Sequence, residues 1–389
     1  MRDVAQVYFD YNATAPVRPE TAAAVAAYFR AAGNPSSVHR TGRHARQAVD
    51  GARRRLAAAV AARPEEVVFT SGGTEANQLA LRGAGAAAIV ATAIEHESVL
   101  EPARRFGLPF RIAPVGADGR LDLAALPAVL DGLPKPVLLA VMLANNEVGT
   151  LQPVAEAARI VHDAGGLLLC DAIQALGKMP LSQPDLGADL MTLSAHKIGG
   201  PQGVGALVVA DHVQLQSQVL GGGQERGRRA GTENVPGIVG FGAALEAAAD
   251  TAWLDRVDRL RHGLEQRLRG LGATIQGANA PRLPNTSAVT MAGMAAETQV
   301  MAFDLAGFAV SAGAACSSGK VSPSHVLRAM GLAPEVAQET IRVSLGWDST
   351  MADVERFAEA WERIATRAAA RQRRTAPPPA GSTGRRAVS

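Results

Sequence analysis

Lys197 is the side chain whose type and surroundings point most directly to chemistry. It lies in Ser194-Ala195-His196-Lys197, ahead of a glycine-rich run, and it is one of only four lysines in a chain with 39 lysines and arginines. A buried amine can lose its proton and attack a carbonyl carbon to form a Schiff base, whereas arginine stays charged and cannot. Most lysines are surface residues that keep their amine in water, so the residues around Lys197 must show whether it is a Schiff-base lysine or an ordinary surface lysine.

Polar groups that follow other predicted strands could assemble around Lys197. The segment 70–75, which contains Gly73 and Thr74, comes after an apolar run and opens a helical pattern, so its backbone N–H groups and a hydroxyl can hold a phosphate. Asp171 follows an apolar run, and a carboxylate there could keep a pyridine nitrogen protonated, which makes the ring an electron sink. Taken alone, Asp171 is as easily a helix N-cap. With Lys197, these groups describe a pyridoxal phosphate site.

His96 and the glycine-rich segment 221–232 are further candidates. His96 also lies at a predicted strand end, although a lone histidine is more often structural. The segment 221–232 has too much glycine for a core and suits a loop that reaches an anionic ligand across a dimer interface. The eight histidines and two cysteines lack metal-ligand spacing, so no metal site is predicted.

The two cysteines have different surroundings. Cys316 lies in 311–320, a run of small residues that cannot pack a core and is predicted to be a loop with an exposed thiol. Cys170 ends an apolar run and is predicted to be a core residue. So few cysteines exclude a disulfide framework and favour a reducing compartment.

Short apolar runs alternate with helical patterns through the first two-thirds of the chain, which predicts an α/β fold with a mainly parallel central sheet covered on both faces. Ligand sites in such sheets lie at the carboxyl ends of the strands. The predicted strands are 66–70, 88–92, 137–141, 167–170, 190–193 and 206–209. A long helical pattern over 236–271 then leads into a smaller α+β unit with predicted strands at 287–290, 309–310 and 341–344 and a last helix over 350–369.

The expected domain organisation is an N-terminal segment 1–15 on the small domain, a large cofactor-binding domain 16–250, a small domain 251–370 and a basic, disordered tail 371–389. The net charge is only +3, so binding of nucleic acid would rest on the tail alone. The chain has no apolar stretch of membrane-spanning length and no signal-peptide pattern, so a cytoplasmic location is expected.

The chain resembles the class I cysteine desulfurases of the nitrogen-fixation and iron–sulfur-cluster type, which are class V aminotransferase-like, fold-type I pyridoxal phosphate enzymes. The resemblance runs from residue 8 to about residue 347 and follows the family's order of motifs. The motifs are Tyr8-Phe9-Asp10-Tyr11-Asn12-Ala13-Thr14, Gly33-Asn34-Pro35-Ser36-Ser37, Ala144-Asn145-Asn146-Glu147-Val148-Gly149, Ser194 to Lys197, Arg229-Ala230-Gly231-Thr232-Glu233-Asn234 and Ser324-His325-Val326-Leu327-Arg328-Ala329-Met330-Gly331.

The resemblance implies a role for each matching residue. Lys197 would anchor the cofactor and later move the substrate's Cα proton, and Cys316 would take the sulfur as a persulfide. His96 would also be catalytic, because it would stack on the cofactor ring and assist proton transfer. The other cofactor contacts implied are Asp171 at the ring nitrogen, Gln174 at the ring hydroxyl, Asn146, and Gly73, Thr74, Ser194, His196 and the second subunit's Thr232 at the phosphate. Asn146 and Arg342 would orient the substrate, with Arg342 on its carboxylate. Lys320 and His325 are candidates for lowering the pKa of the Cys316 thiol.

The implied reaction converts L-cysteine to alanine and passes sulfur to an acceptor protein, such as an iron–sulfur scaffold or a tRNA-thiolation protein, and the expected assembly is a homodimer. Three alternatives stay open. The first is a selenocysteine lyase. The second is a related aminotransferase or hydrolase, and transamination would not need the Cys316 thiol. The third is a sulfur-carrier or assembly platform without catalysis, against which the joint presence of Lys197, Asp171, His96 and Arg342 argues.

Overall fold

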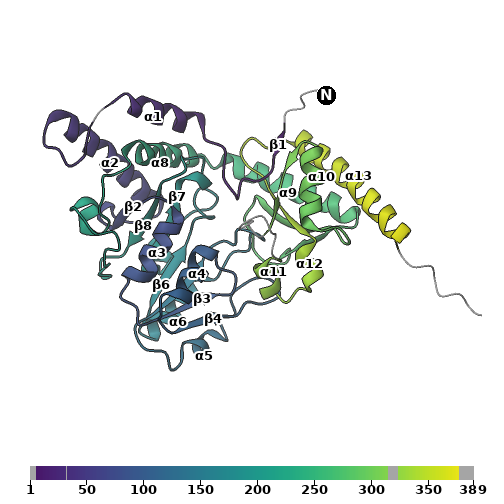
Figure 1. The fold of residues 1–389 in the computed structure, drawn as a ribbon, viewed down its shortest axis with the longest axis horizontal. Helices are drawn as coiled ribbons and strands as arrows, with labels where there is room; N and C mark the ends of the chain where they lie inside the picture. Colours follow the sequence, from purple (N-terminus) through teal and green to yellow (C-terminus); the bar gives the residue numbers. More distant parts are fainter. Residues whose placement is uncertain (1–5, 32, 314–322, 376–389) are drawn as a thin grey trace, which may run out of the picture.

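A mainly parallel, seven-stranded sheet forms the centre of the molecule. The computed structural model describes residues 6–31, 33–313 and 323–375, of which residues 371–375 are described by their backbone alone. The strands lie in the spatial order β2 (Val67–Thr70), β8 (Gly205–Val209), β7 (Leu190–Ser194), β6 (Leu167–Asp171), β5 (Val137–Met142), β3 (Ala88–Thr92) and β4 (Phe110–Ala113), and β8 runs antiparallel to both neighbours (Figure 1). The predicted fold class is confirmed.

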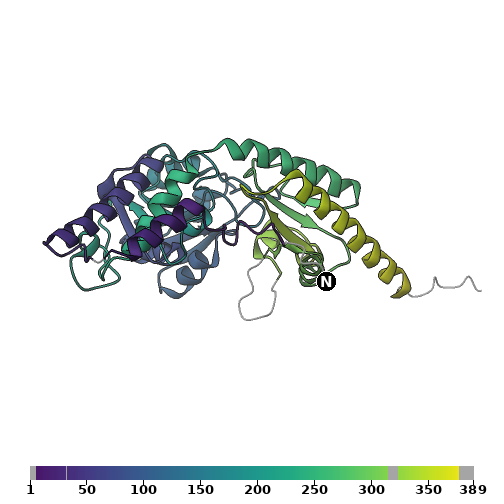
Figure 2. The same ribbon diagram turned by 90° about the horizontal axis from the view of Figure 1, so that it is seen from above.

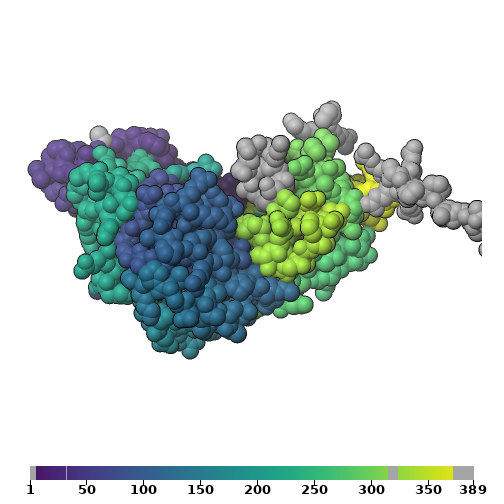
Figure 3. Space-filling model, turned by 60° about the horizontal axis from the view of Figure 1, so that its bottom comes forward, coloured from purple at the N-terminus to yellow at the C-terminus, as the bar shows by residue number. Residues whose placement is uncertain are grey.

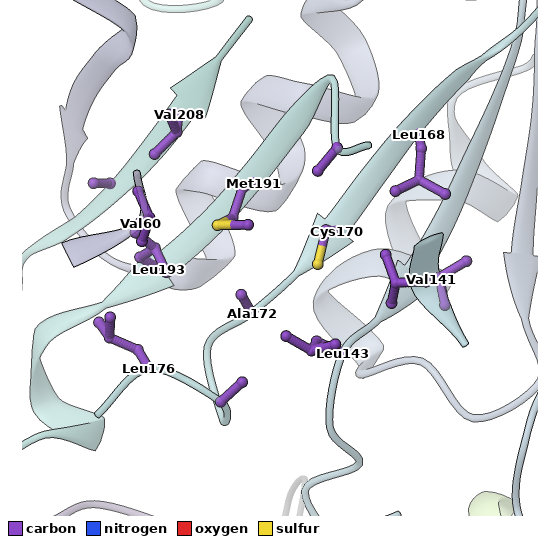
Figure 4. Packing of buried hydrophobic residues seen from close by; sticks show 14 of the residues in the cluster. Val60, Val141, Leu143, Leu168, Cys170, Ala172, Leu176, Met191, Leu193 and Val208 are labelled. Carbon is purple, nitrogen blue, oxygen red and sulfur yellow. The ribbon is translucent and has the colours of Figure 1, made fainter. Parts of the chain in front are cut away.

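Helices cover both faces of this sheet because successive strand residues point to opposite sides. In β6, Leu168 and Cys170 join the hydrophobic cluster beneath three helices, α2 (Arg40–Ala59), α6 (Val154–Asp163) and α8 (Val235–Ala248). Leu169 joins the cluster beneath α3 (Gly73–Gly83) and α4 (Glu97–Arg105) on the other face. Cys170 is fully buried among neighbours that include Val141, Leu168 and Met191 (Figure 4), so its predicted core role is confirmed.

Further elements complete this part of the chain. They are α1 (Pro19–Phe29), which contacts α8, then α5 (Leu126–Leu130), α7 (Gln183–Leu186) and the 3-10 turns η1 (Pro64–Glu66), η2 (Ala195–Lys197) and η3 (Gln224–Gly227).

The C-terminal part is built on a four-stranded sheet in the order β12 (Ser311–Ala312), β13 (Thr340–Ser344), β10 (Thr286–Thr290) and β9 (Thr274–Gln276). The helices α9 (Ala252–Gly270) and α13 (Met351–Thr375) contact each other and lie on one side of this sheet (Figure 2). The N-terminal residues join this part, since β1 (Val7–Tyr8) pairs with β11 (Phe308–Ala309) and Phe9 is fully buried in the same cluster.

The two parts meet through a small apolar cluster. Ile94 and Met142 from the central-sheet part contact Val326 and Leu327 of α11 (His325–Ala329). In the space-filling view, the blue segments that include α4 lie against the yellow-green segment that holds α11 and α12 (Pro334–Gln338) (Figure 3). The remaining helix, α10 (Ala296–Leu305), contacts α13 and β13.

Two element boundaries predicted from sequence were wrong. The helical pattern over 236–271 is two helices, α8 and α9, because the Asp250 carboxylate accepts the N–H of Ala252 and starts a new helix there. The strand predicted at 309–310 is divided between β11 and β12, since residues on either side of Val310 pair with different strands. Sequence reasoning also missed the edge strand β4, because the exposed Arg111 interrupts its apolar residues.

Candidate active site

A cavity of about 380 Å³ gathers most of the predicted site residues. Its lining includes Gly73, Thr74, His96, Asn146, Asp171, Gln174, Ser194, His196, Lys197 and Arg342. The parallel strands explain this convergence, because Asp171 and Ser194 are the last residues of β6 and β7, and His96 follows β3. The cavity therefore lies at the carboxyl edge of the central sheet, where β13 of the C-terminal part supplies Arg342.

The Lys197 amine is held by backbone carbonyls and not by a carboxylate. Its Nζ donates to the carbonyl oxygens of Asn12 at 2.7 Å and Ala13 at 2.8 Å. Burial, helped by the nearby positive charge of Arg342, lowers the pKa of Lys197 to about 8, although Asp10 and Asp171 act in the opposite direction. Near neutral pH a far larger share of Lys197 than of an ordinary lysine is therefore the neutral, nucleophilic amine.

A hydrogen-bonded chain joins Asp171 to His96. Asn77, fully buried in α3, donates from Nδ2 to Asp171 Oδ2 at 3.0 Å and to Ser98 Oγ at 2.9 Å, and Ser98 Oγ lies 2.8 Å from His96 Nδ1. Ile173 N donates to the other oxygen of Asp171. Burial raises the pKa of Asp171 and lowers the pKa of His96. The chain fixes both side chains at the cavity wall, and a cationic partner at Asp171 would keep its carboxylate ionised.

One end of the cavity suits an anion. Helix α3 begins at Gly73, and its first turn leaves backbone N–H groups without helical partners. Ser194 Oγ is buried there and has no hydrogen-bond partner among the described residues. His196 Nδ1 lies 3.1 Å from Thr14 Oγ1, and burial lowers the pKa of His196 to about 4, so its ring is neutral and one of its nitrogens carries a hydrogen. These groups fit a phosphate.

The guanidinium of Arg342 also lines the cavity. Its side chain is 6% exposed, its Nη2 lies 2.7 Å from Asp10 Oδ1, and its Nη1 donates to the carbonyl of Asn146 at 3.0 Å. The Nε atom is buried and has no partner among the described residues. A cation in the cavity wall can receive an anionic group of a ligand, such as a carboxylate.

Thr232 is exposed and lies outside the cavity lining of a single chain. Its segment 221–232 is partly engaged within the chain, because Glu225 pairs with Arg53 and Arg229 pairs with Glu75. These two ion pairs hold the loop against α2 and α3, and its predicted contact with an anionic ligand across a dimer interface stays a prediction. Cys316 and Lys320 lie outside the described residues, and His325 Nε2 lies 2.9 Å from the carbonyl oxygen of Glu95.

Sequence reasoning gave no role to Asn12, Asn77, Ser98 or Lys178, although all four contribute to the site. Lys178 could have been found, since it is one of the four lysines of the chain. Within 6–31, 33–313 and 323–375 no three His, Cys, Asp or Glu side chains gather in a way that could hold a metal ion. No helix in these ranges is long and apolar enough to cross a membrane.

The fold and the site together define a pyridoxal phosphate enzyme, and comparison with known proteins gives its family. Residues 7–357 match the aminotransferase class-V model. A cysteine desulfurase of Cereibacter sphaeroides is 43% identical over 368 residues, which cover 91% of this chain and 94% of that protein. The cysteine desulfurase IscS of Dictyoglomus turgidum is 37% identical over 375 residues, or 92% of this chain and 94% of that protein.

Among solved structures, a NifS-like protein from Rickettsia africae aligns with a TM-score of 0.86 and 33% identity, covering 93% of this chain and 99% of that chain. The chain therefore belongs to the aminotransferase class-V family and, within it, to the cysteine desulfurases, which are pyridoxal phosphate enzymes. The family predicted from the motifs is confirmed.

Proposed function

We propose that this chain removes sulfur from L-cysteine, releases alanine and passes the sulfur through Cys316 to an acceptor protein. The observation that carries the proposal is the Lys197 amine, which has a lowered pKa and lies in one cavity with a phosphate-type end, the Asp171 carboxylate and the Arg342 guanidinium. Those are the groups needed to hold pyridoxal phosphate and an amino acid together.

The residues present fit the cofactor. The first turn of α3 with Thr74, together with Ser194 and His196, would hold its phosphate, and Asp171 would face its ring nitrogen. His96 would lie on the ring, and Gln174 and Asn146 would contact its polar edge. When bound, pyridoxal phosphate supplies an electron sink that stabilises negative charge at the substrate Cα. Thr232 would reach the phosphate from the second subunit of a homodimer.

The chain's own groups then divide the remaining work. Arg342 would grip the substrate carboxylate with the help of Asn146, which orients the Cα–H bond toward Lys197. Lys197 Nζ would take the Cα proton as a neutral amine and return a proton when alanine forms. The Cys316 thiolate would receive the substrate sulfur, so that the C–S bond of L-cysteine breaks, an S–S bond forms and the products are alanine and a Cys316 persulfide.

We further propose that the sulfur acceptor belongs to iron–sulfur or other sulfur-cofactor assembly and that the protein acts in the cytoplasm. The cysteine desulfurase relatives and the two widely separated cysteines support these proposals. The domain division at about residue 250 is also a proposal, supported by separate hydrophobic clusters for the central sheet and the C-terminal part.

The test measures alanine and sulfide from L-cysteine with the purified holoenzyme and a thiol reductant. We expect equal amounts of both products, no product from Lys197→Ala and no sulfide from Cys316→Ala. Lys135→Ala and Cys170→Ala are matched controls, because the first removes an exposed lysine and the second a buried core thiol. Full sulfide release by Cys316→Ala would contradict the persulfide step, and mercaptopyruvate in place of alanine would identify a transaminase.

A further inference from the structure

A second lysine, Lys178, is buried beside the cavity and has no role in the reaction proposed above. It is 5% exposed, and its Nζ donates to Gln174 Oε1 at 2.8 Å and to Asn12 Oδ1 at 3.0 Å. No carboxylate pairs with it in the part of the chain that the structure describes. A buried amine without an opposite charge is costly, which argues that its hydrogen bonds matter.

These bonds fix the direction of the Gln174 amide. A backbone carbonyl can only accept, so Gln174 Nε2 faces the carbonyl of Asn12, 2.9 Å away, and Oε1 faces Lys178, whose N–H group it accepts. Gln174 Nε2 carries a second hydrogen, and Gln174 lines the cavity. The side chain is therefore held as a donor, not as an acceptor, for a ligand in the cavity.

The same amine holds Asn12. Its Oδ1 accepts from Lys178 and from Asn285 Nδ2 at 3.1 Å, while its Nδ2 donates to the carbonyl of Asn146 and to Thr286 Oγ1. The backbone carbonyl of this fixed asparagine accepts both the Lys197 amine and the Gln174 amide. Lys178 thus supports the two groups that face Lys197 and the cofactor ring.

We propose that Lys178 is a positioning residue that locks Gln174 as a hydrogen-bond donor toward the cofactor's ring oxygen and fixes the Asn12 carbonyl that receives Lys197. The inference rests on the proposed function, since it requires the cofactor in this cavity. A donor at the ring oxygen stabilises its negative charge and so lowers the proton affinity of the neighbouring Lys197 nitrogen. The effect needs only the N–H bonds of Lys178 and holds for the neutral amine.

Several charged groups around Lys178 and Lys197 influence the proton affinity of the two lysine nitrogens. Lys178 faces the positive charges of Lys197 and Arg342, and burial is the largest cause that lowers the pKa of Lys178. Lys197 faces Arg342, Asp10 and Asp171. All these groups remain when Lys178 alone is replaced. Met and Gln at this position both remove the amine and its charge, so the difference between the two variants reports the loss of the N–H contacts.

The test is a pH titration of the visible absorption of the bound cofactor, recorded on the holoenzyme without substrate. In Lys178→Met, which keeps the length but loses the N–H groups, we expect the titration to move up by about one unit, a tenfold gain in proton affinity. Lys178→Gln retains an N–H donor toward Gln174 and should shift less. Lys135→Met makes the same change at an exposed lysine and should titrate as the wild type.

A Lys178→Met holoenzyme that titrates within about 0.2 unit of the wild type would overturn the proposal, because a purely structural role lowers the thermal midpoint without moving the titration. Should Lys178→Met not fold, Lys178→Ala is judged by the same criterion. The titration uses no L-cysteine, so its failure is distinct from a failure of the holoenzyme to release alanine and sulfide.

Discussion

The buried ion pair between Arg53 and Glu225 gives a quantitative test of how segment 221–232 is held. Arg53 of α2 donates from Nη1 and Nη2 to the two Glu225 oxygens at 2.8 and 2.9 Å, and the side chains are 10% and 2% exposed. Glu225 Oε2 also accepts the N–H of Phe69 in β2. Glu225 has a φ of 46°, a left-handed conformation that costs about 1 kcal/mol, so the pair must offset local strain as well.

The cost of breaking the pair follows from its burial. Removing one partner leaves an unpaired charge inside the protein, which typically destabilises by about 3–5 kcal/mol. For Glu225→Gln we expect about 3 kcal/mol, because the amide oxygen can still accept one bond from Arg53. Arg53→Met should cost a similar amount, since Glu225 keeps only the Phe69 N–H. The double variant Arg53→Met/Glu225→Gln should cost far less than the sum of the two single variants, with a coupling of about 3 kcal/mol.

The assay is urea unfolding of each variant followed by circular dichroism, because the three tryptophans, 253, 347 and 361, lie outside the central sheet and report elsewhere. The matched control is the exposed pair Arg55–Glu246, which also starts from α2 and whose side chains are 46% and 59% exposed. Glu246→Gln should cost under about 1 kcal/mol. A coupling energy for Arg53 and Glu225 as small as that of this surface pair would refute the reasoning.

Two further predictions concern the cofactor. Burial lowers the pKa of Lys197 to about 8, and only the neutral amine attacks, so capture of pyridoxal phosphate by the cofactor-free protein should accelerate as pH rises toward 8 and then level off. Stopped-flow absorbance measures the capture rate. A rate that still climbs tenfold from pH 9 to 10 would indicate an ordinary lysine. Gly73→Ala should weaken cofactor binding about tenfold in an equilibrium titration, since the added methyl would lie 2.3 Å from Ile173 Cδ1 and push that side chain into the cavity. Gly51→Ala, in an open position on α2, is the control that should bind normally, and equal affinity of both variants would contradict the steric argument.

The central sheet could be predicted from sequence because its strands are buried on both faces. Runs such as 137–141 and 190–193 contain only residues that suit a parallel strand covered by helices, so their apolar character needs no further context. The residues after these strands were predicted to converge for the same reason. Edge strand β4 lacks such a run, and its place depends on pairing with β3, which a local pattern does not report.

The candidate site was predictable where a residue faces the cavity and hard to predict where it acts through another residue. Asp171 and Lys197 both follow predicted strands, and together with the turn at 70–75 their residue types suggest a shared site. Asn77 and Ser98 show no such pattern, because their contribution is a hydrogen-bonded chain between Asp171 and His96 that exists only after α3 and α4 have docked.

Asn12 shows why the site cannot be assembled from motifs alone. Its segment begins in the C-terminal part, where β1 pairs with β11, and continues to the central sheet, where the N–H of Ala15 donates to the carbonyl of His196. The carbonyl of Asn12 receives Lys197, while its amide bonds to Thr286 of β10. The amine therefore reaches its place only when the N-terminal segment, the central sheet and the C-terminal part are packed together. The lowered pKa of Lys197 is accordingly a property of that three-way contact, and a substitution that loosens the segment should weaken cofactor capture even though it touches no cofactor atom.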